Sequence, residues 1–231
     1  MKAMILAAGL GTRLRPLTDK RPKALVEIAG RTLLEITVSR LRAFGIREVI
    51  INVHHFADMI VEYLKTNDSF GMRIEVSREE ILLDTGGGLK KAAWFFLEDS
   101  KGVEEPFILH NVDVISTIDL PRMAQFHNDN RALATIAVQD RKTSRPLLFD
   151  DQLRLCGRAE PGSGLAFSGI HVVSPRILDL IEEGVFSIIT SYLTLAKCGE
   201  KIMAFRADEY RWRDLGKPED LKKAAKEFGV N

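Results

Sequence analysis

Short apolar runs alternate with stretches of helical period along residues 1–140, and this order constrains the fold more than any other feature. Ala3–Ala8 (AMILAA) and Glu48–Val53 (EVIINV) are apolar on both faces, which is typical of strands buried in a parallel sheet. Between them, Thr32–Phe44 carries an apolar stripe of helical period and ends at Gly45. The order predicts an α/β fold, in which helices flank both faces of a mostly parallel, mixed central sheet.

The same pattern continues to the end of the chain. Further strands are predicted at Met72–Ser77, Pro106–His110, Ala132–Gln139, Phe167–Val173, Lys201–Arg206 and Tyr210–Asp214, with a small hairpin at Leu147–Asp150 and Gln152–Cys156. Further helices are predicted at Ala57–Leu64, Gly88–Leu97, Pro121–His127, Pro175–Glu182, Ile188–Ala196 and Pro218–Phe228. We expect one domain over residues 1–231, in which a core at 1–140 is extended by residues 141–231.

Composition excludes several classes of protein. Lys and Arg number 33 against 32 Asp and Glu, so a general nucleic-acid-binding role is not expected. The two cysteines, Cys156 and Cys198, lack the spacing of a zinc site or a disulfide scaffold. No targeting segment is visible, and no run approaches the ~20 apolar residues that span a membrane. We therefore expect a cytoplasmic protein.

The loop Gly9–Lys23 follows the first strand and favours phosphate binding. A Rossmann dinucleotide loop requires a small residue where Leu14 stands, and a Walker A loop requires Gly-Lys-Ser/Thr, which is missing. Gly9 and Gly11 allow backbone N–H groups to approach a polyphosphate. Five cations against one acid strengthen this interpretation: Arg13, Arg15, Lys20, Arg21 and Lys23 against Asp19. The alternative is a solvated basic loop.

Leu6–Thr18 (LAAGLGTRLRPLT) and Pro22–Val26 (PKALV) resemble, without a gap, the signature of sugar-1-phosphate nucleotidyltransferases. The resemblance implies a Rossmann-like, GT-A-like nucleotidyltransferase fold, with nucleotide binding in residues 1–140 and sugar-phosphate binding in 141–231. It also implies transfer of a nucleoside monophosphate from an NTP to a sugar 1-phosphate, with release of pyrophosphate. Matching positions in the first loop are then nucleotide-binding residues: Leu6, Ala8, Gly9, Gly11, Thr12 and Arg13.

The carboxylates that such a reaction needs come from two distant segments. A phosphomonoester nucleophile is already ionised near pH 7, so the chemistry calls for Mg²⁺ and cations rather than a general base. Asp113 follows a predicted strand, and Asp214 lies in a Trp-x-Asp-x-Gly segment of the resembled family. We expect both to bind Mg²⁺, with Arg13 and Lys23 as further catalytic residues. Asp113 as a loop cap is the alternative, and Asp119 is expected to cap a helix.

Three consecutive glycines, Gly86–Gly88, follow Thr85 and indicate either a flexible turn or a close approach of backbone to a ligand. The segment resembles short uridylyltransferases that activate N-acetylmuramate 1-phosphate, which implies that Thr85, the three glycines and Asn111 contact the nucleotide. Sugar-phosphate contacts are implied for Lys23, Ser168, Gly169 and Glu160. The family lysine of Glu-Lys-Pro is missing here, and either Lys23 or Arg158 could replace it.

Two other functions remain open. A cytidylyltransferase acting on phosphocholine shares the first loop, but its acceptor needs an aromatic box, and only 7% of this chain is aromatic. A non-catalytic nucleotide-sensing module is disfavoured because Arg13, Lys23, Asp113 and Asp214 are all present. UTP is favoured by resemblance alone. The sequence does not disclose the base, the sugar or the oligomeric state.

Overall fold

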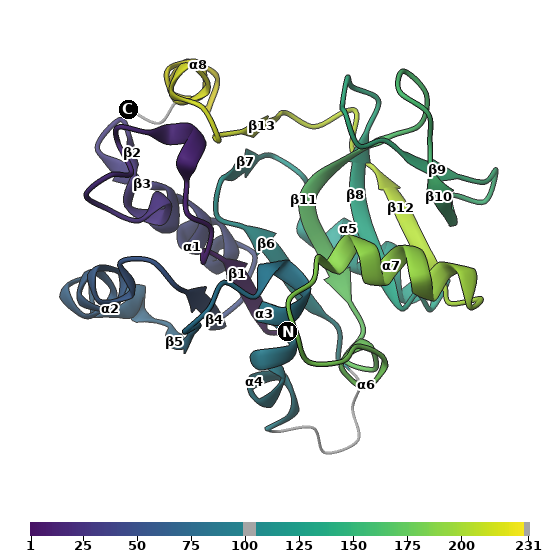
Figure 1. The fold of residues 1–231 in the computed structure, drawn as a ribbon, viewed down its shortest axis with the longest axis horizontal. Helices are drawn as coiled ribbons and strands as arrows, with labels where there is room; N and C mark the ends of the chain where they lie inside the picture. Colours follow the sequence, from purple (N-terminus) through teal and green to yellow (C-terminus); the bar gives the residue numbers. More distant parts are fainter. Residues whose placement is uncertain (99–104, 229–231) are drawn as a thin grey trace.

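A computed structural model of the protein describes residues 1–98 and 105–228 (Figure 1). Its main element is a seven-stranded mixed sheet. Across the sheet the strands are β12 (Ile202–Arg206), β8 (Ala134–Gln139), β11 (Ala166–Val173), β6 (Phe107–Asn111), β1 (Ala3–Leu6), β4 (Glu48–Val53) and β5 (Arg73–Arg78). All neighbours are parallel except β11, which is antiparallel to both β6 and β8. The predicted mixed, mostly parallel sheet is confirmed.

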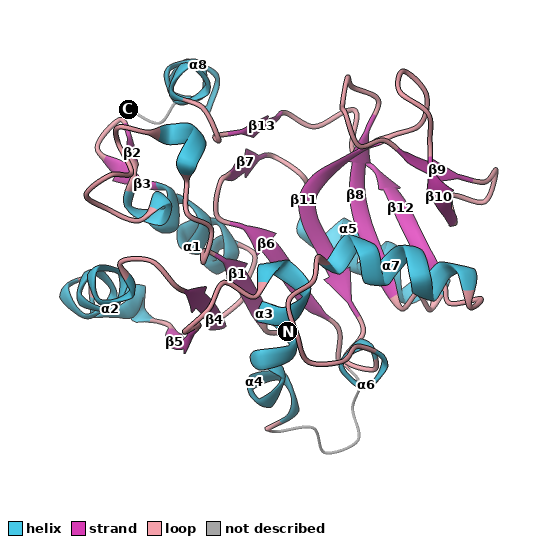
Figure 2. Ribbon diagram, in the orientation of Figure 1, coloured by secondary structure: helices cyan, strands magenta, loops and turns pink. Residues whose placement is uncertain are grey.

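Helices cover both faces of this sheet (Figure 2). One hydrophobic cluster includes residues of α1 (Leu33–Ala43), α2 (Ala57–Thr66), α5 (Leu120–Asn130) and α8 (Pro218–Phe228). The other includes residues of α3 (Asp84–Lys91), α4 (Ala93–Leu97), α6 (Ile177–Leu180) and α7 (Ile188–Lys197). In β1, Ala3 and Ile5 face the first cluster and Met4 faces the second, which is why the strand is apolar at every position.

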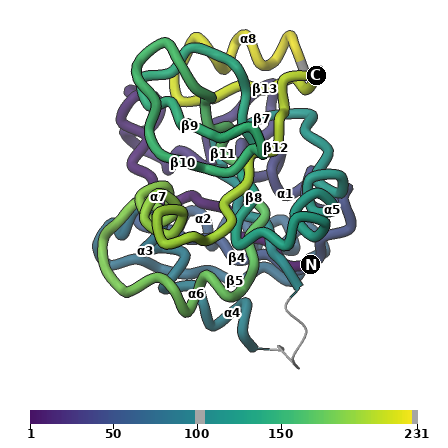
Figure 3. The backbone as a smooth tube through the Cα atoms, turned by 90° about the vertical axis from the view of Figure 1, so that its right-hand side faces the viewer, coloured from purple at the N-terminus to yellow at the C-terminus, as the bar shows by residue number. Residues whose placement is uncertain are grey.

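The second part of the chain completes the sheet that the first part begins. Strand β11 inserts between β6 and β8, and β12 adds the far edge beside β8. Figure 3, turned by 90°, shows these strands flanked by α7 and α5. Residues after about 145 thus contribute two strands, β11 and β12, to the same sheet.

Three two-stranded sheets lie outside the main one. The hairpin of β9 (Leu147–Phe149) and β10 (Leu155–Arg158) matches the predicted hairpin. Strand β7 (Val114–Ser116) pairs antiparallel with β13 (Trp212–Asp214), which brings together segments about 100 residues apart. The third pair is β2 (Glu27–Ile28) and β3 (Arg31–Thr32).

Several predicted helix boundaries are wrong. Helix α3 begins at Asp84 rather than at Gly88, and a break at Ala92 separates it from α4. Helix α6 is only one turn, because Ile181 is already extended. The predicted cap is confirmed, since Asp119 accepts the N–H of Arg122 at 2.9 Å. None of the helices in the described part of the chain combines the length and apolar character that crossing a membrane requires.

Candidate functional site

The first loop folds back on itself at the carboxyl end of β1. Gly11 adopts a left-handed conformation (φ 66°), and its carbonyl accepts a hydrogen bond from the Thr18 hydroxyl at 2.9 Å. A Cβ at Gly11 would lie 2.9 Å from Thr18 Cγ2 and 3.1 Å from Lys23 Cβ. Leu14 is fully buried and anchors the 3₁₀ turn Thr12–Leu14. Gly11 is therefore required by the loop's own packing, whereas Gly9 has open space at its Cβ position.

A pocket of about 470 Å³ lies at the ends of β1 and β6; we name it the strand-end pocket. Leu6–Gly9 line it, and so do the apolar residues Leu82 and Val185. Of the predicted site residues, it brings together Leu6, Ala8, Gly9, Lys23, Thr85, Asn111 and Asp113. Its lining also includes Ala7, Asn52, Asp84 and Val112, which were not predicted.

Buried polar side chains fix the shape of the strand-end pocket. Asn52 Oδ1 accepts the N–H of Ala7 at 2.8 Å, and its amide donates to Glu79 Oε1 at 2.7 Å. The other Glu79 oxygen accepts the N–H of Leu83 at 2.9 Å. This network ties the end of β1 to the segment before α3. A sequence signal was available, since Asn52 interrupts the otherwise apolar end of EVIINV.

The three glycines lie inside α3 and not in a turn before it, which corrects that expectation. A Cβ at Gly86 would lie 2.2 Å from the Phe186 ring, and one at Gly87 would lie 2.0 Å from the Gly184 carbonyl. At Gly88 the neighbours would be Asn52 and Glu79, each at 2.7 Å. The absence of side chains at these three glycines thus allows other parts of the protein to pack closely against the helix. All three glycines are buried.

The two predicted acids lie at the junction of β7 and β13. Asp214 pairs in register with Val114, and the N–H of Leu215 donates to the Asp113 carbonyl at 2.8 Å. Each acid meets a cation of the first loop. Lys23 forms an ion pair with Asp113, and Arg13 lies 3.9 Å from Asp214. The acids line different pockets, which share Asn111 as a common lining residue.

A partly buried cation supports the strand end that carries Asp113. Arg40 on α1 donates to the Ser116 hydroxyl at 2.7 Å and to the Ile118 carbonyl at 2.5 Å. Its Nη1 lies 3.3 Å from Nε2 of His110, whose Nδ1 lies 2.8 Å from the Asn111 carbonyl. Since a carbonyl only accepts, Nδ1 carries the proton and Nε2 accepts from Arg40. Burial lowers the pKa of His110 to about 3, so the ring is neutral.

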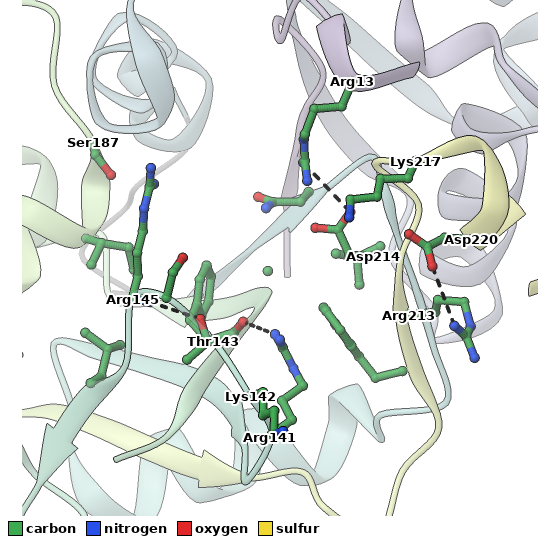
Figure 4. Close-up of a pocket in the computed structure, with 18 of the residues that line it drawn as sticks. Arg13, Arg141, Lys142, Thr143, Arg145, Ser187, Arg213, Asp214, Lys217 and Asp220 are labelled. Atoms are coloured by element: carbon green, nitrogen blue, oxygen red, sulfur yellow. Dashed lines mark hydrogen bonds and ion pairs between the residues drawn. The ribbon is translucent and has the colours of Figure 1, made fainter. Parts of the chain in front are cut away.

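A second pocket, of about 860 Å³, opens between the first loop, β11 and β13 (Figure 4); we name it the cation-rich pocket. Seven basic side chains line it against two acids, Asp214 and Asp220. The basic residues are Arg13, Arg141, Lys142, Arg145, Arg158, Arg213 and Lys217. Arg213 is already engaged by Asp220 and Glu227. Sequence reasoning missed Arg141, Lys142, Arg145 and Lys217 because no motif marks them.

The predicted sugar-phosphate residues are placed differently from one another. Gly169 lines the cation-rich pocket with φ 75°, and a Cβ there would lie 2.7 Å from Val114. Ser168 is fully buried, and its hydroxyl has no hydrogen-bond partner in the described residues. Glu160 is exposed and lines neither pocket, and the same holds for Thr12 of the nucleotide set.

The donor set fits Mg²⁺ only in combination with a substrate. No group of three His, Cys, Asp or Glu side chains that could hold an ion occurs in residues 1–98 and 105–228. Asp113 uses Oδ2 and Asp214 uses Oδ1 in the contacts above, which leaves one oxygen on each carboxylate. Mg²⁺ commonly takes one or two carboxylates and completes its shell with phosphate oxygens and waters. The residues present therefore fit such an ion.

A family model described as nucleotidyl transferase matches residues 2–147. The chain belongs to this family. The predicted membership among sugar-1-phosphate nucleotidyltransferases is confirmed, and with it the nucleotidyltransferase reaction class. The match covers β1, the first loop, and the strand end that carries Asp113, and it ends before β11 and β13.

Similar curated proteins fall into two groups by length. An N-acetylmuramate alpha-1-phosphate uridylyltransferase of Caulobacter vibrioides is 33% identical, and the match covers 94% of this chain and 92% of that protein. A mannose-1-phosphate guanyltransferase of Yarrowia lipolytica is 31% identical over 96% of this chain, but the match covers only 62% of that protein.

Two solved structures are similar over nearly the whole chain. HddC from Yersinia pseudotuberculosis, in complex with GMP-PN, has a TM-score of 0.79 at 25% identity, covering 98% of this chain and 99% of that one. A putative glucose-1-phosphate thymidylyltransferase from Bacillus anthracis has a TM-score of 0.81 at 20% identity, covering 97% and 93%, and supports the fold alone.

Proposed function

We propose that the protein transfers a nucleoside monophosphate from an NTP to a sugar 1-phosphate and releases pyrophosphate. The observation that carries this proposal is the junction of β7 and β13, where Lys23 contacts Asp113 and Arg13 approaches Asp214 between two pockets. One pocket suits a nucleoside and the other suits an anionic acceptor. Family membership supports the same reaction class.

In the proposed reaction a phosphate oxygen of the sugar 1-phosphate attacks the α-phosphorus of the NTP. A new P–O bond forms, the bond to the β-phosphate breaks, and pyrophosphate leaves with the electron pair. Arg13 and Lys23 orient the phosphates and offset their mutual repulsion. Mg²⁺ on Asp113 and Asp214 would supply further charge neutralisation. We assign nucleotide binding to the strand-end pocket in residues 1–140 and sugar-phosphate binding to residues 141–231.

UTP is the proposed nucleotide. The support is the uridylyltransferase of Caulobacter vibrioides, which matches over nearly its full length. The guanyltransferases and the GMP-PN complex of HddC make GTP the strongest competitor. Much of the lining is apolar, from Leu6–Gly9, Leu82, Val112 and Val185, so it offers few side chains that could distinguish one base from another by hydrogen bonding. A cytoplasmic location stays a prediction.

A matrix of UTP, GTP, CTP, ATP and dTTP against three acceptors tests the proposal by pyrophosphate release. Suitable acceptors are the 1-phosphates of N-acetylmuramate, mannose and glucose, with phosphocholine as a fourth. We expect turnover that depends on added Mg²⁺, stops with excess chelator, and is fastest with UTP. Turnover with phosphocholine and none of the sugars would favour the cytidylyltransferase alternative. Nucleotide binding without turnover of any acceptor would favour a sensing module.

A further inference from the structure

Arg141 lines the cation-rich pocket (Figure 4). There it is held against the face of Trp212. Its guanidinium carbon lies 3.8 Å from the centre of the Trp212 ring, which is cation–π stacking distance. Arg141 Nη2 donates to the Phe167 carbonyl at 2.6 Å, and Trp212 Nε1 donates to the next carbonyl, that of Ser168, at 2.7 Å. Consecutive carbonyls of β11 therefore fix both members of the stacked pair.

The stacked guanidinium has no anionic partner of its own. Arg141 forms no ion pair with an Asp or Glu in the described residues, and its buried Nε has no hydrogen-bond partner there. Burial lowers the pKa of Arg141, although Asp214 opposes that shift. Desolvating a guanidinium without a carboxylate is costly unless an anion arrives to bind it. The ordered position suits a receptor for such an anion, because little side-chain entropy remains to be lost.

Arg141 is also placed beside the predicted reaction centre. Trp212 and Asp214 are two residues apart on β13, so both side chains lie on the same face of that strand. All three residues line the cation-rich pocket together with Gly169 and Arg13. An anion bound to Arg141 would therefore share the pocket with Asp214.

The other cations considered for this role are less well suited. Lys23 is engaged by Asp113 and lines the strand-end pocket. Arg158 is exposed, and its guanidinium donates only to the Arg145 carbonyl at 3.3 Å in the described structure. Neither is stacked or fixed at two points.

We propose that Arg141, stacked on Trp212, binds the phosphate of the acceptor sugar 1-phosphate and replaces the lysine that this chain lacks at Arg158-Ala159-Glu160-Pro161. The inference rests on the proposed function. It assigns the acceptor's anionic group to the cation-rich pocket and the triphosphate to the first loop. A planar guanidinium can donate two parallel hydrogen bonds to a phosphate, which a lysine cannot.

Steady-state kinetics of R141M and R141K test the assignment. With the acceptor found active in the matrix, R141M should raise KM for the sugar 1-phosphate by about 10- to 100-fold and leave KM for the NTP within about twofold. R141K should raise it by a smaller factor, because the charge is kept and the bidentate geometry is lost. R154M is the matched control, since Arg154 is exposed on the β9–β10 turn and lines neither pocket.

Tryptophan emission gives a readout that does not require turnover. The chain has two tryptophans, so W94F leaves Trp212 as the sole reporter, and Trp94 is exposed on α4. Titrating W94F with the 1-phosphates of N-acetylmuramate, mannose and glucose should give a saturable change in emission with the sugar that is active. The unphosphorylated sugar should give none, and W94F/R141M should need about 10- to 100-fold more ligand.

The outcomes separate the two proposals. The Arg141 assignment is overturned if R141M turns over with an unchanged KM for the acceptor. It is also overturned if R158M has a larger KM for the acceptor than R141M. Neither result contradicts the proposed reaction. No turnover with any acceptor, together with a saturable emission change that R141M abolishes, overturns the reaction and supports the anion site. A rise of both KM values in folded R141M also overturns the assignment, because it indicates general disturbance of the site.

Discussion

The strand-end pocket and the cation-rich pocket share Asn111 as a lining residue but differ in the chemistry of their other lining residues. The end of β1 and apolar residues such as Leu82 and Val185 line the first, whose charged lining residues in the described structure are Lys23, Asp84 and Asp113. The second has seven basic lining residues against two acids. We expect apolar contacts to contribute more to ligand binding in the first pocket, and charge to contribute more in the second. Substitution of one charged side chain should therefore affect the two substrates unequally.

The largest expected effect comes from Asp113, which lines the strand-end pocket and contacts Lys23. D113N keeps the shape but removes the charge that pairs with Lys23 and that is proposed to hold Mg²⁺. We expect kcat to fall by about 10³-fold or more, measured by pyrophosphate release at saturating substrates. D151N, on the exposed β9–β10 turn, is the matched control. A D113N rate within tenfold of the parent would contradict the metal assignment.

Lowering the pH should reduce the free energy of unfolding. It should not remove the positive charge of the cation-rich pocket, since arginine and lysine side chains are protonated at neutral and acidic pH. Burial lowers the pKa of His110 and His171 to about 3 and of His127 to about 4. As pH falls below about 6.5, these histidines therefore become protonated in the unfolded chain while they are still neutral in the folded protein. Between pH 7 and 5.5 we expect a loss of about 1 kcal/mol of unfolding free energy for each histidine.

Urea unfolding at several pH values measures this loss. H127Q should reduce the pH dependence by about one third, because His127 lies on α5 away from both pockets. A stability that is constant from pH 7 to 5.5 would contradict the neutral, buried state of these rings.

Close packing behind the strand-end pocket predicts the next effect. In G87A the new Cβ would lie 2.0 Å from the Gly184 carbonyl, so the segment that carries Val185 must shift. Such overpacking costs about 1–3 kcal/mol, against about 1 kcal/mol that alanine gains over glycine in a helix. We expect a lower Tm and a higher KM for the NTP. G157A is the control, since it meets nothing within 4 Å, and an equal Tm for both variants would refute the packing argument.

The smallest effect is expected at the apolar edge of the strand-end pocket. Val185 is 61% exposed, and a bound nucleoside would cover part of that surface. V185S should raise KM for the NTP by about two- to fivefold and leave KM for the sugar 1-phosphate unchanged. L148S, at another exposed apolar side chain, should change neither constant. Equal rises in both KM values for V185S would contradict the proposal that the two pockets bind different substrates.

What the sequence predicts well is local in the chain. β1 and the first loop were predictable because LAAGLGTRLRPLT is contiguous, and Asp113 was predictable because it follows an apolar strand. The sheet was predictable from the alternation of apolar runs. In each case the physical signal lies within about 20 neighbouring residues.

What the sequence did not predict depends on contacts between distant segments. The reason for Gly86 and Gly87 lies in Gly184 and Phe186, about 100 residues later. The Arg141 stack depends on β13 lying against β11. The register between β11 and β8 shifts between Phe167 and His171, next to Ser168 and Gly169, and strict alternation of strand faces cannot anticipate such an irregularity.

Strand β8 consists of six buried residues, and its partners in the main sheet are β11 and β12. Both partners follow it in the chain, at residues 166–173 and 202–206. During synthesis β8 therefore leaves the ribosome with both hydrogen-bonding edges open. One edge stays open until β11 has been made, and the other until β12 has been made. A product that stops near residue 147 would carry this apolar strand unpaired and would aggregate rather than fold.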